Sequence, residues 1–362
     1  MAQTVGIRVR GASTRSGVDK SLTVFARKEY AGSDTFDQNV FDADLHSLIL
    51  RSRPNPQMEG FLSSLIADRS VAVQKYEMVR LFINGEFWGF YSFMTRIDEQ
   101  YLSAQYGVDT DDIKLLKIYY PSKESDEDAD MYQEYEQYED YFRHTDMSDP
   151  DHYRAACERV DMQSLIDSYV MQIYINNVDG SHEKNMMLWK TKNATGGKYS
   201  DGRWRYGLYD LDYALFSQVD DTEFGYDFNY FNSELPFTDA LYEDPIFMSL
   251  MNSAAFREQF YQSFLEIAWN NFDPLRVRAL LDALPYRDRN DDIAEFFDKR
   301  PLYIFGYLDD FMENYRAYSA ADIEEISEAV LFLLLIFCLL MLWMIVRHRK
   351  RYGGRFFERK GS

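Results

Sequence analysis

Cysteine is scarce in this chain, whose 362 residues include two, Cys157 and Cys338. Because Cys338 lies inside a long apolar run, we expect no intrachain disulfide, and no Cys/His group has structural-zinc spacing. The 9 prolines and 18 glycines exclude collagen-like and proline-rich chains. The first ten residues contain no apolar run of signal-peptide length.

Basic residues are outnumbered, with 39 Lys and Arg against 60 Asp and Glu and a net charge of −21. A field of this sign repels phosphate backbones, so nucleic acid is not an expected partner. Residues 347–362 carry seven basic residues and one Glu, which leaves a net charge of −27 on the preceding chain. Such an acidic body favours a protein partner rich in Lys and Arg.

The longest apolar run is residues 329–346, 18 residues without a charge. As a helix it would be roughly 27 Å long, close to the ~30 Å hydrocarbon layer of a membrane. Trp343 lies near one end and the basic residues 347–351 follow at once. The run therefore predicts one transmembrane helix, because the alternative, a buried core helix, usually keeps a polar face.

The positive-inside rule places the basic tail in the cytoplasm and the acidic body outside it. That orientation requires an export signal, which the first residues do not supply. We therefore expect that N-terminal sequence is missing. The alternative is a tail-anchored chain with its body inside the cell.

Hydrophobic residues make up 46% of the chain and aromatic residues 17%, enough for a packed core. The periodicity predicts an α+β fold, with strands first and helices later. Expected strands and hairpins lie at 5–11, 21–30, 76–94 (turning at Asn84-Gly85), 186–190 and 204–209. Expected helices lie at 45–50, 58–66, 97–106, 161–176 and over most of 239–312.

Residues 124–146 combine many acidic side chains with aromatic residues at helical spacing, namely Tyr132, Tyr135, Tyr138 and Phe142. One interpretation is an amphipathic helix that packs its tyrosine stripe on the body. The other is a surface that binds a partner or attracts cations.

Three segments could carry chemistry. The turn from Gly11 to Gly17, with Ser13, Arg15 and the following Lys20, could hold a phosphate, although hairpin turns use Gly and Ser in any case. The second segment has Asp179 followed by Asn185, between a helix and a strand. Asp179 could accept a hydroxyl proton and Asn185 could bind magnesium, or the segment could be an Asx-rich turn.

The third segment is Asp210-Leu211-Asp212 at the end of a predicted strand. Alternation along that strand would put both carboxylates on one face, where hard oxygen ligands suit Mg²⁺. The alternative is a strand-end cap. Together, the three segments follow the order of parts in phosphoryl transfer. A glycoside hydrolase built on paired carboxylates is a weaker alternative.

These segments together resemble the CotH kinase family, atypical protein kinases named for a spore-coat protein. The resemblance rests on five stretches: GASTRSGVDKS, LFINGEFWGFYSFMTRIDEQYL, NNVDGSHEKNMMLW, WRYGLYDLDYALF and FFDKRPLYIFGYLDDF. It implies a two-lobed, protein-kinase-like domain over residues 1–316. Residues 317–328 would then be a juxtamembrane linker, followed by the transmembrane helix at 329–346 and the basic cytoplasmic tail at 347–362.

The resemblance also implies ATP and Mg²⁺ as cofactors. The acceptor would be a serine or threonine of a protein partner rich in Lys, Arg and Ser. Family members are often exported or exposed on the cell surface. In this family Asp179 would be the catalytic aspartate and Lys20 would contact the ATP phosphates. The turn residues Gly11, Ser13 and Arg15 would lie beside Lys20, and the metal ligands would be Asn185, Asp210 and Asp212.

Two departures from the family pattern bear on activity. The family often has Glu where this chain has Thr95, so an ion pair from that Glu would be lost. The domain also starts almost on the glycine turn, which fits a missing N-terminal segment. The alternative function is therefore a weak pseudokinase, or a surface adhesin or other binding protein, on the same fold.

Overall fold

The computed structural model describes residues 2–11, 15, 19–38, 40–52, 57–119, 129–178, 180, 184–211, 213–215, 217–219, 222–231, 241, 244–284 and 289–314. These residues belong to one compact unit, Met1–Arg316. The expected membrane-spanning run and basic tail lie outside the described residues. Within the described chain, no helix is both long enough and apolar enough to cross a membrane.

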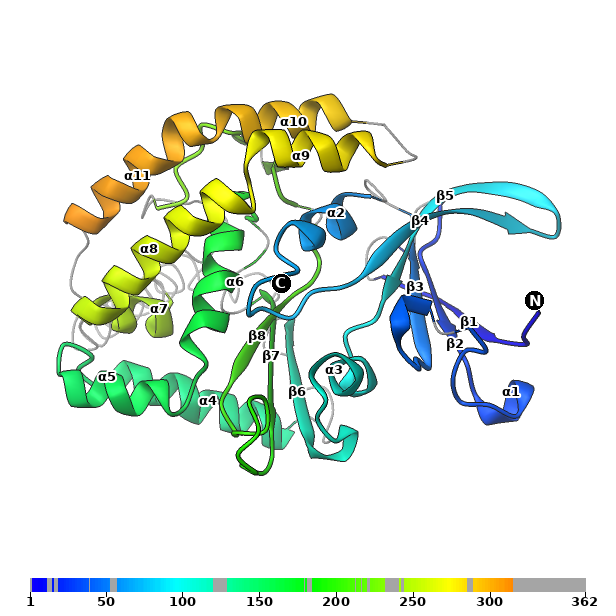
Figure 1. Ribbon diagram of the computed structural model, residues 1–362, viewed down its shortest axis with the longest axis horizontal. Helices are drawn as coiled ribbons and strands as arrows, with labels where there is room; N and C mark the ends of the chain where they lie inside the picture. The colour runs from blue at the N-terminus through cyan, green and yellow to red at the C-terminus, as the bar shows by residue number, and fades with distance from the viewer. Residues whose placement is uncertain are drawn as a thin grey trace, which may run out of the picture. The chain divides into compact units, whose positions relative to one another are not determined.

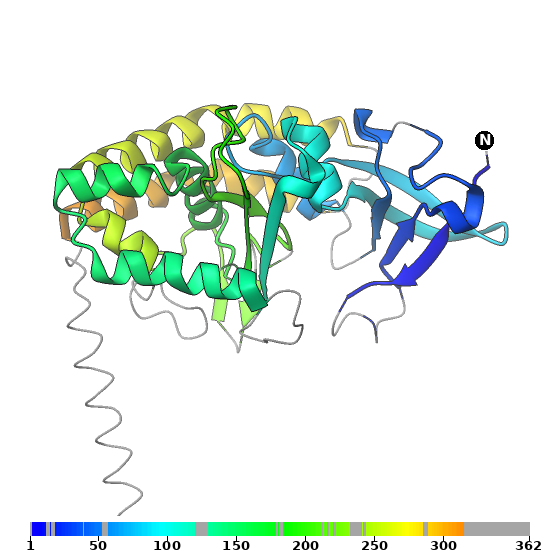
Figure 2. The ribbon, with the colours of Figure 1, turned by 90° about the horizontal axis from the view of Figure 1, so that it is seen from below.

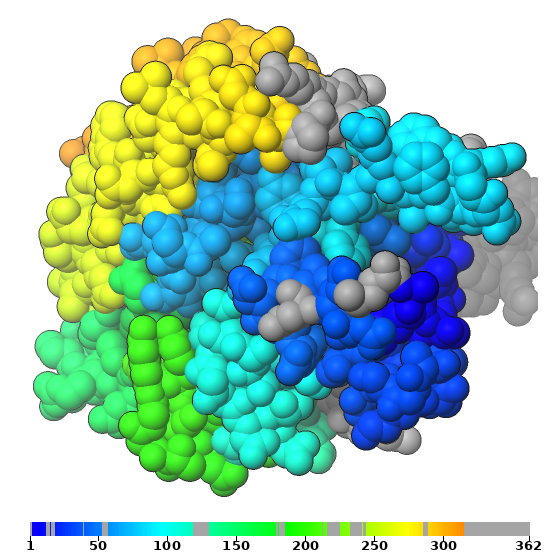
Figure 3. All heavy atoms as spheres, turned by 45° about the vertical axis from the view of Figure 1, so that its right-hand side comes forward, coloured from blue at the N-terminus to red at the C-terminus, as the bar shows by residue number. Residues whose placement is uncertain are grey.

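The N-terminal region is built on a five-stranded antiparallel sheet in the order β1-β2-β3-β5-β4. Figures 1 and 2 show this sheet on one side and the long helices on the other. The space-filling view shows the same separation, with the N-terminal strands in blue to cyan and the late helices in yellow to orange (Figure 3). The strands are β1 (Gly6–Val9), β2 (Leu22–Phe25), β3 (Ser47–Arg51), β4 (Tyr76–Ile83) and β5 (Glu86–Thr95).

The β4–β5 hairpin confirms the turn expected at Asn84-Gly85. Both residues have positive φ, 53° and 84°, as a two-residue hairpin turn with the twist of the strands requires. By contrast, the helix expected at residues 45–50 is wrong, since this stretch forms strand β3. All five β3 residues are buried, so the apolar run has no alternation to distinguish a strand from a helix.

A second antiparallel sheet, in the order β6-β7-β8, lies between the first sheet and the helices (Figure 1). Its strands are β6 (Ile113–Tyr119), β7 (Lys184–Thr191) and β8 (Arg205–Leu208), and a short hairpin, β9 (Ser217–Val219) and β10 (Thr222–Phe224), follows.

The early helices are α1 (Lys28–Ala31), α2 (Met58–Leu65) and α3 (Glu99–Tyr106), with 3₁₀ turns at Val40–Asp42 and Thr110–Asp112. The later helices are α4 (Ala129–His144), α5 (Pro150–Cys157), α6 (Met162–Tyr174), α7 (Pro245–Met251), α8 (Ala254–Asn270), α9 (Pro274–Asp282), α10 (Asn290–Lys299) and α11 (Pro301–Asn314). A strand-rich N-terminal region and a helical C-terminal region confirm the α+β prediction.

Helix α4 carries the tyrosine stripe, and the stripe packs on the body. Tyr135, Tyr138 and Phe142 are buried, and the Tyr138 hydroxyl lies 3.2 Å from that of Tyr206 on β8. The acidic side chains Glu136 and Asp140 are exposed on the other side of the helix. The amphipathic interpretation of this segment is therefore confirmed.

Helix α2 approaches β4 closely because it has a glycine at the contact. A Cβ atom on Gly60 would lie 2.2–2.8 Å from Cβ and ring atoms of Tyr76, which is closer than atoms can pack. The close approach sets the position of the neighbouring Glu59, which is buried.

We expect Gly60→Ala to lower the free energy of unfolding by about 1–3 kcal/mol, the usual cost of overpacking. This loss occurs although Ala is favoured over Gly in a helix by about 1 kcal/mol. Urea denaturation followed by circular dichroism measures the change. The matched control is Gly306→Ala on α11, where a new Cβ meets nothing within 4 Å, so the variant should be slightly stabilised. Equal effects at the two positions would contradict the packing argument.

Candidate active site

The turn between β1 and β2 holds three of the expected phosphate-binding residues, Gly11, Arg15 and Lys20, while Ser13 lies outside the described residues. Gly11 has φ 109°, a conformation that favours glycine. The Lys20 ammonium donates a hydrogen bond to the carbonyl oxygen of Arg15, so this lysine folds back over its own turn.

The end of this turn is tied to the end of β3. Ser52 donates its backbone N–H to the Ser21 hydroxyl (3.1 Å) and its own hydroxyl to the carbonyl of Asp19 (3.2 Å). The backbone N–H of Arg10 donates to the carbonyl of Ser21 (2.8 Å). These bonds place the glycine turn beside Arg51, the last residue of β3.

Arg51 bridges two carboxylates that are far apart in the sequence. Its Nη1 lies 2.7 Å from Oε2 of Glu59 on α2, and its Nη2 donates to Oδ1 of Asp210 at 2.6 Å. Oε1 of Glu59 also accepts the backbone N–H of Asp210 (2.8 Å). The Glu59 side chain is 2% exposed and that of Asp210 is 30% exposed, so solvent and ligands can reach the aspartate.

Arg10 lies near this bridge, and Arg96 and Lys117 lie near Arg10. Arg10 interacts electrostatically with Glu59, Arg51, Asp210 and Arg96. Burial lowers the pKa of Lys117 on β6 to about 8, and the neighbouring Arg96 and Arg10 shift it in the same direction. The Lys117 ammonium donates to the carbonyl of Ile97 (2.6 Å). Within the described chain, the half-buried guanidinium groups of Arg10 and Arg96 form no hydrogen bond or ion pair.

The strand argument for Asp210 and Asp212 does not hold. Strand β8 ends at Leu208, and Asp210 has φ 59°, so it lies beyond the strand in a left-handed conformation. Asp212 lies outside the described residues. Alternation along a strand therefore does not orient these carboxylates, and the contacts to Arg51 and Glu59 orient Asp210 instead.

Asn185 lies near the start of β7 and is buried. Met186 of β7 pairs with Leu208 of β8 in an antiparallel register, so Asn185 and Asp210 occur at the same end of this ladder. The expected catalytic residue Asp179 lies outside the described residues, between the described Val178 and Gly180.

Arg300, between α10 and α11, holds the start of the loop through five hydrogen bonds. It is fully buried, and burial lowers its pKa to about 9, so it stays charged at neutral pH. It donates to Oδ1 of Asn176 at 2.7 Å, while Nδ2 of Asn176 donates to the carbonyl of Gly225. The other four bonds reach the carbonyls of Ile173 (3.1 Å), Tyr174 (2.9 Å), Tyr226 (2.9 Å) and Phe228 (2.6 Å).

The next part of the loop is held by contacts among Gln172, Asn177, Gly180 and Tyr230. Nδ2 of Asn177 donates to Oε1 of Gln172 at 2.7 Å. A Cβ on Gly180 would lie 2.7 Å from both amide groups, so these side chains would have to shift to admit one. The Tyr230 hydroxyl donates to the carbonyls of Asn177 (3.3 Å) and Gly180 (3.2 Å). The loop that carries Asp179 is thus fixed on both sides.

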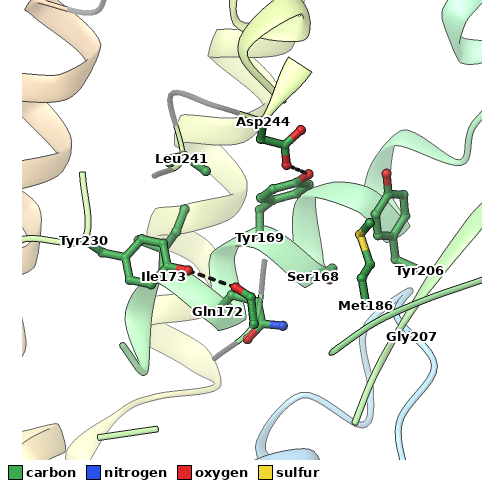
Figure 4. A pocket seen from close by; sticks show the side chains of 11 residues that line it. Ser168, Tyr169, Gln172, Ile173, Met186, Tyr206, Gly207, Tyr230, Leu241 and Asp244 are labelled. Carbon is green, nitrogen blue, oxygen red and sulfur yellow. Dashed lines mark hydrogen bonds between the residues drawn. The ribbon is translucent and has the colours of Figure 1, made fainter. Parts of the chain in front are cut away.

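A small internal cavity of ≈30 Å³ lies beside this loop, between α6 and β8 (Figure 4). The Tyr169 hydroxyl donates to Oδ2 of Asp244 at its edge, and Oδ1 of Asp244 caps the start of α7. The volume suits one or two water molecules and is too small for a nucleotide. This cavity is therefore not a nucleotide site, whereas the cations at Arg51 and Arg10 have the chemistry that phosphates require.

The described residues that could hold a metal ion are Asn185 and Asp210. Their amide and carboxylate oxygens are the hard ligands that Mg²⁺ uses. Among the described residues no cluster of three or more His, Cys, Asp or Glu could hold a metal. Mg²⁺ in phosphate sites commonly uses one or two carboxylates together with the phosphates, so the two residues are compatible with it.

Sequence reasoning missed Arg51, Glu59 and Arg300. Thr95, which replaces the Glu common in the family, ends β5 and is buried, and its hydroxyl accepts the backbone N–H of Lys75 (3.0 Å). A different ion pair lies next to Asp210, formed by Arg51 with Glu59 on α2. The sequence does hold a signal for Arg51 and Glu59. Each is a charged residue in an otherwise apolar stretch, LILR for Arg51 and MEGFL in α2 for Glu59.

A comparison with protein-family models matches residues 7–290 to the CotH kinase protein model. The chain belongs to the CotH kinase family. It is therefore a kinase-like protein. No curated protein matches it. Among solved structures it is similar to the Helicobacter pylori proinflammatory kinase CtkA, with 8% sequence identity, a TM-score of 0.39, and coverage of 80% of this chain and 92% of that one.

The match to the CotH kinase family ends at residue 290, so Arg300 lies outside it. We expect Arg300→Lys to lower the free energy of unfolding by about 2–5 kcal/mol. One ammonium cannot reach all five acceptors, and each buried group left unsatisfied costs about 1–3 kcal/mol. Urea denaturation of the full chain measures the change.

The matched control is Arg276→Lys. Nη1 of Arg276 alone donates to the carbonyls of Leu65 (3.0 Å) and Asn271 (2.6 Å), a pair that one ammonium can also serve. This variant should lose less than about 1 kcal/mol. If both variants lose the same stability, Arg300 has no special part in holding the loop.

Proposed function

We propose that this chain is a protein kinase that transfers the γ-phosphate of ATP to serine or threonine hydroxyls of a protein partner, with Mg²⁺ as cofactor. Membership of the CotH kinase family supports kinase-like chemistry. The observation that carries the proposal is the pair of cations at Asp210: Arg51 bonds its carboxylate, and Arg10 lies close enough to interact with both.

These cations are unusual in a chain in which acidic residues outnumber basic ones by 60 to 39. Arg10 interacts electrostatically with Glu59 and Asp210, but among the described residues its guanidinium forms no hydrogen bond or close ion pair. Half-buried cations of this kind are stabilised when an anion reaches them. A triphosphate carries several negative charges and many acceptor oxygens, so it complements Arg10 and Arg51.

Each expected residue has a role in this proposal. Asp179 would accept the proton of the substrate hydroxyl, and Asn185, Asp210 and Asp212 would hold Mg²⁺. The bound metal would offset the charge that spreads over the transferred phosphoryl group. The turn with Gly11, Ser13, Arg15 and Lys20 would cover the phosphates, since Ser21 and Ser52 tie its end beside Arg51.

The first test of this proposal is calorimetric titration of ATP into the full chain, with and without Mg²⁺. Wild type should bind ATP more tightly with the metal, and Asp210→Asn should lose that metal-dependent gain by at least about 10-fold, a loss that even outer-shell substitutions reach. The control is Asp151→Asn, an exposed aspartate on α5, which should bind like wild type.

A folded wild-type chain that binds no ATP would overturn the proposal. It would favour the alternative function, a pseudokinase or surface-binding protein on the same fold. Circular dichroism of each variant establishes that it is folded before the titration.

We also propose that residues 329–346 anchor the chain in a membrane, with the basic tail in the cytoplasm and the acidic domain outside it. The support is the uncharged 18-residue run and the basic residues after it. The protein partner would then be an exported or surface protein, and the acidic body favours one rich in Lys, Arg and Ser.

Alkaline extraction of membranes tests the anchor. The full chain should stay in the pellet, while a Leu335→Arg, Leu339→Arg variant should be released, because each central arginine costs about 2.5–3.5 kcal/mol on insertion. The control places arginine at Leu275 and Leu302, two exposed leucines of the folded domain, and should stay in the pellet. Release of wild type would rule out the anchor.

A further inference from the structure

A second cleft, of ≈530 Å³, lies at the far end of the β6-β7-β8 sheet from the candidate active site. Its floor comes from Lys114 on β6 and Lys190 on β7, and α4 forms one wall with Glu134 and Tyr141. Lys192 and the loop residue Arg159 complete its rim. The volume is in the range of ligand-binding clefts.

The cleft is locally basic although the chain is acidic. Its lining has four cations, Lys114, Arg159, Lys190 and Lys192, against two carboxylates, Glu134 and Glu158. Lys114 and Lys190 are direct cross-strand partners, an arrangement that costs free energy through like-charge repulsion. Glu134 supplies one negative charge against these two lysines, so the pair keeps a net positive charge that attracts an anion.

Lys114 and Lys190 already bind one carboxylate of the chain. Glu134 lies between them, bonded to Lys114 through Oε1 and 3.0 Å from the Lys190 ammonium through Oε2. Burial alone would raise the pKa of Glu134, but the hydrogen bonds from Lys114 and Lys190 lower it below its usual value. Because each lysine has three N–H donors, the pair can bind a second oxyanion beside Glu134.

The cations of the cleft are held in place by neighbouring groups. The Lys190 ammonium lies 4.7 Å from the centre of the Trp204 ring, and the Arg159 guanidinium lies 4.2 Å from that of Tyr141. The Lys192 ammonium donates to the carbonyl oxygen of Asp111. Such contacts reduce the entropy that the side chains would lose on binding a ligand.

We propose that this cleft binds the carboxylate or phosphate groups of an acidic segment in a protein partner. The site is separate from the catalytic one, because β7 runs five residues, about 17 Å, from Asn185 to Lys190. This role rests on the proposed function. The cleft would hold a substrate protein through an acidic segment roughly five extended residues from the phosphorylated hydroxyl.

The test is fluorescence anisotropy with the full chain, without ATP or Mg²⁺. The probe is a fluorescein-labelled ten-residue peptide of Glu and Gly that contains no hydroxyl side chain. The control peptide has Gln in place of Glu. We expect binding of the Glu peptide alone, and weaker binding as the salt concentration rises.

The decisive variant is Arg159→Glu, Lys192→Glu, which reverses two exposed charges at the rim and should weaken binding at least about 10-fold. The matched control is Lys198→Glu, an exposed lysine of the same β7–β8 connection that does not line the cleft. It should bind like wild type. A phosphoserine version of the peptide should compete for the same site in wild type and lose its binding in the double variant.

Equal binding of the Glu and Gln peptides, or equal losses in the double variant and in Lys198→Glu, would overturn the proposal. The result is independent of the kinase proposal, because the assay contains no nucleotide. A chain that binds the peptide but no ATP loses only the kinase function, and one that binds ATP but no peptide loses only the second site.

Discussion

The ion pairs of Arg51 join parts of the chain that are more than 150 residues apart. Glu59 and Asp210 approach each other, with a backbone N–H of one bonded to the carboxylate of the other. Two carboxylates so close would repel each other, and the guanidinium between them offsets that repulsion. Through this one side chain, strand β3, helix α2 and the segment after β8 meet at the site. The glycine turn is fixed beside it by Ser52.

Arg300 and Arg10 differ in what surrounds them, and the contrast separates a structural role from a proposed ligand-binding one. All the hydrogen bonds of Arg300 go to carbonyl and amide oxygens of the chain, so its charge is solvated from within the fold. The half-buried guanidinium of Arg10 forms no hydrogen bond or close ion pair among the described residues. Oxygens supplied by a ligand would satisfy it beside the partly exposed Asp210.

Sequence patterns predicted the elements that are determined by interactions between residues close in the sequence. The Asn84-Gly85 turn, the tyrosine stripe of α4 and helix α3 ending before Gly107 follow from turn chemistry and periodicity. The strand at Ser47–Arg51 was missed because a stretch buried on both faces shows no period. The roles of Glu59 and Arg300 could not be read from the sequence. The sequence shows a charged residue in an apolar stretch, but some groups that it contacts, such as Asp210 for Glu59, come from distant segments.

The Arg51 bridge also bears on how a metal ion would bind at this site. Oδ1 of Asp210 accepts from Arg51, which leaves Oδ2 of the same carboxylate for a metal ion. Arg51 would then keep its contacts to both Glu59 and Asp210 and hold the aspartate in place for that metal. This ion pair does not require a Glu at position 95, because α2 supplies the carboxylate that holds Arg51.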